Sequence, residues 1–305
     1  MDPDRARGAL LGLATGDAVG TTLEFKPRGT FEPITDMVGG GPFALESGQW
    51  TDDTAMALAL AESLLACTGH DPVDQLERYV RWWRHGETSC TGHCFDIGNT
   101  VRDALQRYLD TGTPDAGPTH PHTAGNGSIM RLAPVVLAYA PDPKATVAAA
   151  AASSRTTHGA PEAIDACRLL AEILLRALGG ADRDATLAPV EGLRATDALA
   201  TVASSTYRGN SAEHVRGSGY VVESLEAALW AVATTASFAD AVLRAANLGD
   251  DADTTAAIAG QVAGALYGAS GIPPHWLNQL AWRDRLEDTA DALLALRPTD
   301  SIQMS

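Results

Sequence analysis

"NLGDDADTTAAIAGQVAGALYG", residues 247–268, places three aspartates and two threonines at the head of a segment that is otherwise almost all alanine and glycine. Glycines recur every four residues at Gly260, Gly264 and Gly268, so they would share one helix face. A glycine inside a helix costs about 1 kcal/mol relative to alanine, and close packing against a neighbouring helix compensates for that cost. The stretch therefore predicts a central helix that begins near Asp253 and carries a buried or half-buried acidic head.

This acidic head holds more carboxylates than helix capping requires. One aspartate can accept the free backbone N–H groups of a first turn, and the remaining ones repel it and each other. Unpaired carboxylates are costly to bury. We therefore expect cations to bind at this head.

A second stretch has the same character. "QWTDDTAMALALAES", residues 49–63, places Thr51, Asp52, Asp53 and Thr54 directly before another alanine-rich run. Mg²⁺ and Mn²⁺ prefer carboxylate, hydroxyl and water oxygens, and both heads supply them. Capping alone explains a single head of this kind. Two such heads in one chain favour one or two divalent cations held between two helix starts.

The rest of the chain also has helical patterns, and alternating strand patterns are absent. A small-residue face recurs near the N-terminus, where Gly12, Gly16 and Gly20 share one side of a helix. Glycine and proline lie at the joints, and no break in composition divides the chain, so we predict one all-α domain over residues 1–305. The predicted helices cover residues 5–20, 52–67, 71–86, 96–110, 161–180, 218–235, 237–249 and 283–297, with a further one beginning near residue 253.

Composition excludes several classes of protein. The 305 residues include 22 Lys and Arg against 38 Asp and Glu, which gives a formal charge of −16 and argues against general nucleic-acid binding. No apolar run approaches the ~20 residues of a membrane span, and the N-terminus lacks a signal-peptide pattern. We expect a soluble, cytoplasmic and monomeric protein.

Two groups of metal-ligating residue types carry weaker signals. "CTGHC" brings Cys90, His93 and Cys94 close together, but no second Cys-x-x-Cys pair completes a tetrahedral zinc site, so reduced thiols in a turn are favoured. His120 and His122 lie beside prolines, and we interpret them as loop residues because no third ligand is evident nearby.

Six stretches, in this order, resemble the ADP-ribosylglycohydrolase family, particularly a bacterial branch similar to the dinitrogenase reductase-activating glycohydrolase. They are "GALLGLATGDAVGTTLEF", "GQWTDDTAMAL", "CFDIGNTVRDAL", "GNGSIMRLAP", "THGAPEA" and "LGDDADTTAAIAGQVAGALYG". The resemblance covers nearly the whole chain. Its specific feature is the pairing of Thr-Asp-Asp-Thr with Asp-x-Asp-Thr, which lie some two hundred residues apart.

The resemblance implies an all-α orthogonal multi-helix bundle with two Mg²⁺ or Mn²⁺ ions at the bottom of a cleft. The metal ligands that it implies are Thr51, Asp52, Asp53, Asp251, Asp253 and Thr254. Asp250 falls where family members vary, so we expect it to be a cap or a group beside the ligands. The implied reaction is hydrolysis of the bond between C1″ of ADP-ribose and an acceptor side chain of an ADP-ribosylated protein or conjugate.

Glycoside cleavage passes through an oxocarbenium-like transition state and needs an acid–base carboxylate near the anomeric carbon. A pair of metal ions can orient ribose hydroxyls and lower the pKa of a water between them. Asp52 or Asp53 would then position or deprotonate that water. Glu24 matches a family position at the cleft mouth that helps to gate or polarise the site; without the resemblance it is equally well an ordinary surface glutamate.

An acidic protein must bind the pyrophosphate of ADP-ribose mainly through backbone N–H groups of glycine-rich turns. Three turns are candidates: residues 39–41, residues 125–128 and residues 217–220. The resemblance places the distal ribose at the second turn and the phosphates and adenosine at the third, with His158 near the ligand and Tyr220 as a candidate for stacking on adenine. The implied substrate-binding residues are Gly125, Asn126, Gly127, Ser128, His158, Gly217, Ser218, Gly219 and Tyr220.

Three functions stay open on the sequence alone. The first is a hydrolase that removes ADP-ribose from arginine, although the scaffold also acts on O-linked ADP-ribosyl serine, O-acetyl-ADP-ribose and polymeric ADP-ribose. The second is a catalytically silent ADP-ribose-binding or structural protein, which the presence of all four aspartates of the two heads disfavours. The third is a two-metal phosphohydrolase that cleaves the pyrophosphate.

Overall fold

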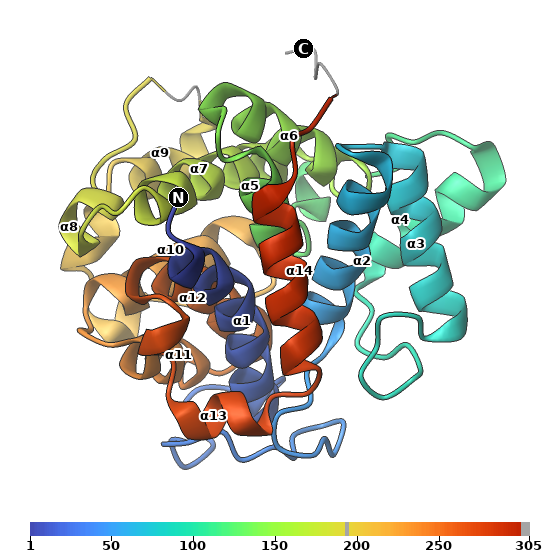
Figure 1. Ribbon diagram of the computed structural model, residues 1–305. Coiled ribbons are helices and arrows are strands. Elements are labelled where there is room, and N and C mark those ends of the chain that lie inside the picture. The colour runs from blue at the N-terminus through green and yellow to red at the C-terminus, as the bar shows by residue number, and fades with distance from the viewer. Residues whose placement is uncertain (193–194, 300–305) are drawn as a thin grey trace.

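The computed structural model describes residues 1–192 and 195–299 (Figure 1). Within these ranges the chain forms fourteen α-helices and five short 3-10 helices, and its β-structure is limited to isolated bridges, so the predicted all-α fold class is confirmed. The α-helices are α1 (Pro3–Gly20), α2 (Asp52–Cys67), α3 (Pro72–His85), α4 (Asn99–Thr111), α5 (Ala133–Tyr139), α6 (Pro143–Arg155), α7 (Pro161–Leu178), α8 (Arg183–Thr186), α9 (Asp197–Ala203), α10 (Val221–Ala233), α11 (Phe238–Ala246), α12 (Ala252–Tyr267), α13 (Pro274–Gln279) and α14 (Arg283–Ala295). The 3-10 helices are η1 (Thr21–Leu23), η2 (Pro121–Thr123), η3 (Thr206–Gly209), η4 (Ala212–His214) and η5 (Ala269–Gly271). None of the helices in the described ranges has both the length and the hydrophobicity to cross a membrane.

α1 and α12 pack against each other in antiparallel directions at the centre of the molecule (Figure 1). A Cβ atom added to Gly12 would lie 2.2 Å from the Gly260 carbonyl oxygen, and one added to Gly260 would lie 2.0 Å from the Gly12 carbonyl oxygen. Gly8 and Gly264 repeat this reciprocal contact, at 2.2 and 1.9 Å. The two backbones therefore touch directly, and the small-residue face predicted on each helix is the surface through which they meet.

Gly268 lies just past the last residue of α12, although its backbone still contacts α1 at Gly8. It has a left-handed backbone with φ of 78° and follows Tyr267, the last residue of α12. A Cβ atom at this position would lie 2.0 Å from the Asp4 carboxylate. The predicted stripe of three helical glycines is therefore wrong at its third member, because the chain leaves the helix where Gly268 adopts a conformation that favours glycine.

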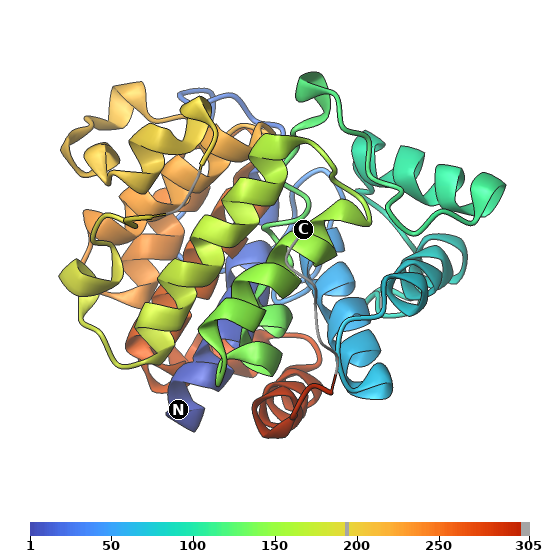
Figure 2. The same cartoon turned by 90° about the horizontal axis from the view of Figure 1, so that it is seen from above.

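The other helices surround the α1–α12 pair. α7, α10 and α11 pack on one side of it, while α14 and α2 lie on the other side with α3 and α4 beyond them (Figure 1). Seen from above, α5, α6 and α7 lie side by side across the molecule, and α3 and α4 lie at its periphery (Figure 2). Because α1 and α12 are antiparallel, the end of α1 lies beside the start of α12, and this is where the site forms.

The predicted and observed helices differ mainly at their ends and in length. The α2 bounds agree with the prediction at both ends, whereas α4 begins at Asn99 and leaves Asp96 in the preceding loop with a φ of 57°. α5 was not predicted because its seven residues are too few to display a helical period. α6 was not predicted because its run of alanines has no polar face to alternate with.

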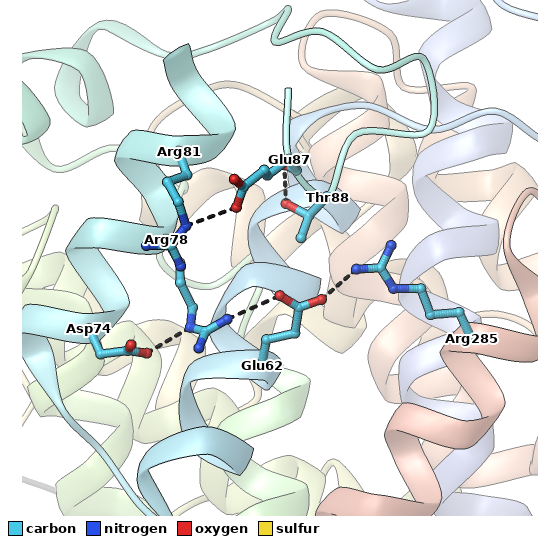
Figure 3. Close-up of polar contacts among 7 residues, drawn as sticks. All are labelled: Glu62, Asp74, Arg78, Arg81, Glu87, Thr88 and Arg285. Carbon is cyan, nitrogen blue, oxygen red and sulfur yellow. Dashed lines mark hydrogen bonds and ion pairs between the residues drawn. The ribbon is translucent and has the colours of Figure 1, made fainter. Parts of the chain in front are cut away.

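A surface network of ion pairs joins three helices on the α2 side of the molecule (Figure 3). Glu62 of α2 accepts from Arg78 of α3 at 3.2 Å and from Arg285 of α14, and Arg78 also pairs with Asp74 at 2.7 Å. Figure 3 also shows Arg81 reaching the Glu87 carboxylate in the loop after α3. The network links the peripheral α3 to the helices next to the core.

Candidate active site

The two acidic heads lie side by side in the structure. The hydroxyl of Thr51, directly before α2, lies 3.2 Å from an oxygen of Asp253 in the first turn of α12. The hydroxyl of Thr254 lies 3.4 Å from an oxygen of Asp53. Residues some two hundred positions apart in the sequence are therefore brought into hydrogen-bonding distance by the packing of α2 and α12 against α1.

α2 is capped by a side chain from another helix. Thr51 occupies its N-cap position but makes no side-chain cap hydrogen bond. Instead, the Asp17 carboxylate of α1 accepts from the backbone N–H and the hydroxyl of Thr51, at 2.8 and 2.9 Å. It also accepts from the backbone N–H and the hydroxyl of Thr54, at 3.0 and 2.7 Å. The local aspartates of α2 are therefore not needed as caps, and the capping interpretation of this head is wrong.

α12 is capped in the same way. Its N-cap residue, Asp251, makes no side-chain cap hydrogen bond. One oxygen of Glu24, which follows η1, accepts from the backbone N–H groups of Ala252 and Asp253, at 2.8 and 3.3 Å. Glu24 is only 4% exposed, so the surface-glutamate interpretation is wrong. Its carboxylate joins those of Asp251 and Asp253 in one cluster.

Asp250 lies one residue outside the N-cap position of α12, so it does not cap the helix. Its backbone has a φ of 58° and pairs with the segment after η1: Phe25 N–H donates to the Asp250 carbonyl at 2.8 Å, and Asp250 N–H donates to the Lys26 carbonyl at 2.9 Å. The Asp250 side chain is exposed at the rim of the cleft. The expected capping role of Asp250 is therefore wrong, and its place beside the ligands stays a prediction.

The buried carboxylates are close to each other and lack basic partners. Each of two groups, Asp17 with Asp53 and Asp253, and Glu24 with Asp251 and Asp253, has one oxygen per residue within 4.8 Å of the others. In the described part of the chain no Lys or Arg forms an ion pair with any of them. One oxygen of Asp53 is buried with no hydrogen-bond partner.

Burial and mutual repulsion raise the pKa values of these carboxyl groups. Burial, followed by the Asp253 charge, raises the pKa of Asp17 to about 7, and the same two causes raise the pKa of Asp251 to about 7. Burial is also the largest cause for Asp52 and Asp53, whose pKa values lie well above the ordinary range. Because nothing else among the described residues compensates their negative charges, these carboxylates favour the binding of protons or cations.

Asp96 belongs to the same region but was not predicted as a site residue. It lies on the wall of the cleft, and burial together with the Asp52 charge raises its pKa to about 11. The sequence interpretation placed Asp96 at the start of a helix, whereas it occupies a left-handed position in the loop before α4. Its signal was the motif "CFDIGN", in which an aspartate stands three residues ahead of the helix.

A cleft of about 770 Å³ opens above these carboxylates. Its volume falls within the range of small-molecule sites. Of the predicted site residues, eleven line it: Glu24, Asp52, Gly125, Asn126, Gly127, His158, Ser218, Gly219, Asp251, Asp253 and Thr254. Phe25, Asp96 and residues 97–101 complete much of the remaining wall.

Two of the three glycine turns meet beside the carboxylates. The Asn126 N–H donates to the Gly219 carbonyl at 3.2 Å, and Gly125 forms a bridge with Tyr220. The Asn126 side chain donates to Asp251 at 2.9 Å, and a Cβ atom on Gly219 would lie 3.3 Å from the same carboxylate. Both turns are thus attached to the head of α12.

The remaining predicted residues lie behind or beside the cleft. Thr51 and Asp53 are buried behind its wall, and Ser128 is 3% exposed. Gly217 packs against Thr255, whose hydroxyl would lie 2.9 Å from an added Cβ atom. The Tyr220 ring is 38% exposed next to the third turn. The turn at residues 39–41 does not line the cleft; it packs instead against Thr21 and Thr22.

The cysteines and the paired histidines do not form a metal site in the described residues, where the candidate ligand groups consist only of carboxylates. Cys90 donates its Sγ–H to the Trp50 carbonyl at 3.4 Å, and burial raises its pKa to about 11. The rings of His120 and His122 lie 5.0 Å apart on an exposed loop. Cys90 and Cys94 are free thiols and His122 lies in η2, while the expected absence of a metal at both places stays a prediction.

Comparison with known proteins identifies the family. The ADP-ribosylglycohydrolase family profile matches residues 2–302. The chain belongs to the ADP-ribosylglycohydrolase family. The resemblance and the enzyme class predicted from the sequence are therefore confirmed.

Relatives within this family are similar over almost the whole chain. An ADP-ribosylarginine hydrolase, Tri1, of Pseudomonas putida (strain GB-1) is 51% identical over 97% of this chain and 79% of the relative. An ADP-ribosyl-dinitrogen reductase glycohydrolase of Rhodospirillum rubrum is 36% identical over 97% of this chain and 98% of the relative. A solved structure of an ADP-ribosylglycohydrolase-related protein complex has 45% identity and a TM-score of 0.86, covering 96% of this chain and 98% of that chain.

Proposed function

We propose that this family member hydrolyses the bond between C1″ of ADP-ribose and an arginine side chain of a modified protein, with residues 1–305 acting as one domain. The observation that carries the proposal is the cleft whose floor is formed by the carboxylates of two helix starts and whose wall is formed by two glycine turns. The arginine assignment is supported by the relatives that are 51% and 46% identical, both ADP-ribosylarginine hydrolases.

We further propose that two Mg²⁺ or Mn²⁺ ions bind at the two heads. Thr51, Asp52, Asp53, Asp251, Asp253 and Thr254 would hold them. The donor set fits hard cations because it consists of carboxylate and hydroxyl oxygens. Within residues 1–192 and 195–299 it also lacks basic partners and includes an oxygen of Asp53 with no hydrogen-bond partner. When bound, the ions supply positive charge that orients ribose hydroxyls and makes a water more acidic.

The side chains of the cleft divide the remaining work. Asp52 lines the cleft, whereas Asp53 is fully buried behind it, so we favour Asp52 as the group that positions the attacking water. Asp96 faces the same space from the α4 side and is placed to contact the substrate. Glu24 fixes the start of α12 through two backbone N–H groups and thereby sets the positions of Asp251 and Asp253.

The substrate's ADP-ribose would lie along the two joined turns. Backbone N–H groups of Gly127 and Gly219 are available to phosphate or hydroxyl oxygens at the cleft wall, whereas the Gly125 N–H donates to the Thr123 carbonyl at 2.8 Å. Tyr220 is placed to stack on the adenine at the open end of this wall, where part of its ring is accessible. The turn at residues 39–41 has no role in this proposal.

The test is to measure release of ADP-ribose from arginine-modified and serine-modified peptides side by side, with Mg²⁺ present. Free ADP-ribose from the arginine peptide alone is the expected result. Release from the serine peptide alone would assign the enzyme to O-linked ADP-ribose. AMP as the product would instead indicate cleavage of the pyrophosphate, and binding of ADP-ribose without turnover of either peptide would indicate a silent binding protein.

A further inference from the structure

Arg131 is a buried cation that has no counter-ion in the part of the chain that the structure describes. It lies between the second glycine turn and α5, is 0% exposed, and pairs with no carboxylate among the described residues. Its Nε atom likewise has no hydrogen-bond partner within these residues. A buried unpaired charge is unfavourable for folding, so its contacts need an explanation other than stability.

The guanidinium of Arg131 contacts two parts of the cleft wall. One terminal nitrogen donates to the Gly127 carbonyl at 2.8 Å, and the other donates to the Thr157 hydroxyl at 2.6 Å. Its planar group also lies over the Tyr79 ring at 4.7 Å, which supplies partial compensation for the charge. Arg131 therefore connects the turn at residues 125–128 with the segment that carries His158.

The Thr157 hydroxyl continues this chain of contacts to His158. Its oxygen already accepts from Arg131, and it lies 2.9 Å from Nδ1 of His158. A hydroxyl group has one proton to donate. Among the described residues no other hydrogen-bond acceptor is found for that proton, so donation to Nδ1 is the arrangement that pairs it, whereas an Nδ1–H would leave the hydroxyl proton unpaired. A neutral imidazole that accepts at Nδ1 must carry its own proton on Nε2.

The Nε2 edge of His158 faces the second glycine turn and the cleft. A Cβ atom added to Gly125 would lie 3.4 Å from Nε2, and one added to Gly127 would lie 3.0 Å from it. All three residues line the cleft. The two glycines therefore leave open the space through which an N–H at this edge can reach a bound molecule.

We propose that Arg131 is a positioning residue: through Thr157 it holds His158 in the neutral form protonated at Nε2, so that His158 donates a hydrogen bond to a hydroxyl or phosphate oxygen of the bound ADP-ribose group. The identity of this ligand rests on the proposed function, whereas the hydrogen-bond chain does not. The same guanidinium holds the Gly127 carbonyl, so the turn and the histidine keep a fixed relation to each other.

The electrostatics of the pocket agree with this arrangement. Burial, followed by the Arg131 charge, lowers the pKa of His158 to about 3. The imidazole is therefore neutral throughout the physiological range, and its donor is available without a net positive charge.

The test measures the tautomer directly, by ¹⁵N NMR of histidine-labelled protein without substrate, with the His158 signals assigned from a His158→Gln variant. The expected wild-type result is a protonated Nε2 and an unprotonated Nδ1. Thr157→Val, which keeps the shape but removes the hydroxyl, should give a mixture of tautomers and raise KM for the ADP-ribosylated peptide roughly tenfold with a smaller change in kcat. Thr157→Ser should restore both properties.

Two outcomes would overturn the proposal. One is a wild-type His158 protonated at Nδ1, and the other is a Thr157→Val protein that keeps both the wild-type tautomer and the wild-type KM. A wild-type protein with the expected tautomer that binds and cleaves no ADP-ribose conjugate would support the hydrogen-bond chain while refuting the proposed function. The two ideas can therefore fail separately.

Discussion

Asp17 and Glu24 carry out the same local task in different surroundings. Each accepts backbone N–H groups at the start of a distant helix, Asp17 for α2 and Glu24 for α12. Asp17 uses both carboxylate oxygens for four donors and is fully buried. Glu24 uses one oxygen for two N–H groups and lines the cleft.

This difference separates a structural carboxylate from one that also belongs to the site. Because the segment at the end of α1 caps both helices, the aspartates of the two heads are left without a capping role and lie close together. Asp17 has its ligand capacity occupied by Thr51 and Thr54, whereas Glu24 keeps an oxygen that can interact within the cleft. We expect a substitution of Asp17 to lower mainly the stability of the fold, and a substitution of Glu24 to lower mainly the activity.

We expect the largest effect on activity at Asp253, because this residue belongs to both groups of buried carboxylates. Asp253→Asn should lower ADP-ribose release by at least about a hundredfold, because metal charge contributes several kcal/mol to such transition states. Helical content measured by circular dichroism should be retained, since Asp253 does not cap α12. Asp250→Asn is the matched control on the exposed rim and should keep nearly wild-type activity. Full turnover by Asp253→Asn in Mg²⁺ would refute the two-head metal site.

Gly12→Ala would disturb the packing on which both caps depend. The added methyl group would lie 2.2 Å from the Gly260 carbonyl oxygen, and backbone atoms there cannot move aside independently. We expect a loss of about 3 kcal/mol in the free energy of unfolding, measured by urea denaturation. Gly209→Ala is the control, since an added Cβ atom there meets no neighbour within 4 Å. Equal stability of the two variants would mean that α1 and α12 do not determine the fold.

Asp17→Asn and Glu24→Gln compare the two caps directly. An asparagine amide would turn its NH₂ group toward two of the four donors that Asp17 satisfies, so unfolding should become easier by about 2–3 kcal/mol. Glu24→Gln can keep its carbonyl oxygen on both N–H groups of α12, so its stability should change by less than about 1 kcal/mol. The main effect of Glu24→Gln should therefore be a loss of activity. The opposite ranking in a urea titration would show that Glu24 is the structural cap.

The sequence predicted α2 and the central position of α12 because these features depend on patterns among neighbouring residues. Alanine and leucine periodicity defines α2, and glycine spacing defines the face of α12. The two acidic heads were predicted to meet from a resemblance to known proteins and from their shared composition. This part of the site was therefore predicted from the residue types of the two heads and not from their distance along the chain.

The parts that could not be predicted depend on contacts between distant residues. The hydrogen bond from Ala252 to Glu24 spans 228 positions, so no local pattern shows that Glu24 is a cap. Asp17 is the one acidic residue among residues 8–20 of α1, and the quoted stretch that contains it does not show that it accepts from Thr51 and Thr54. Arg131 stands in a quoted motif, yet the absence of a counter-ion is a property of its surroundings and not of the motif.

The response of thermal stability to pH should distinguish cation-free from cation-bound carboxylates. The pKa values of Asp17 and Asp251 are raised to about 7, compared with about 4 in unfolded chains. Between these values the folded protein binds more protons than the unfolded one, so stability with EDTA should fall as pH rises from about 4 to about 7. Mg²⁺ should then raise Tm by a few degrees, more at pH 8 than at pH 5, because it binds the deprotonated folded form. A Tm indifferent to EDTA and Mg²⁺ at both pH values would contradict this.

Glu62 provides the opposite case, a carboxylate with two basic partners on the surface (Figure 3). Its side chain is 35% exposed, and solvent screens exposed ion pairs. Glu62→Gln should therefore change the free energy of unfolding by less than about 1 kcal/mol, with Arg78 retaining its pair with Asp74, and should leave ADP-ribose release unchanged. Glu32→Gln, at an exposed glutamate outside this network, is the control for loss of one negative charge. If Glu62→Gln cost as much as Asp17→Asn, burial would not be what makes the Asp17 cap strong, because a paired surface carboxylate would then contribute equally.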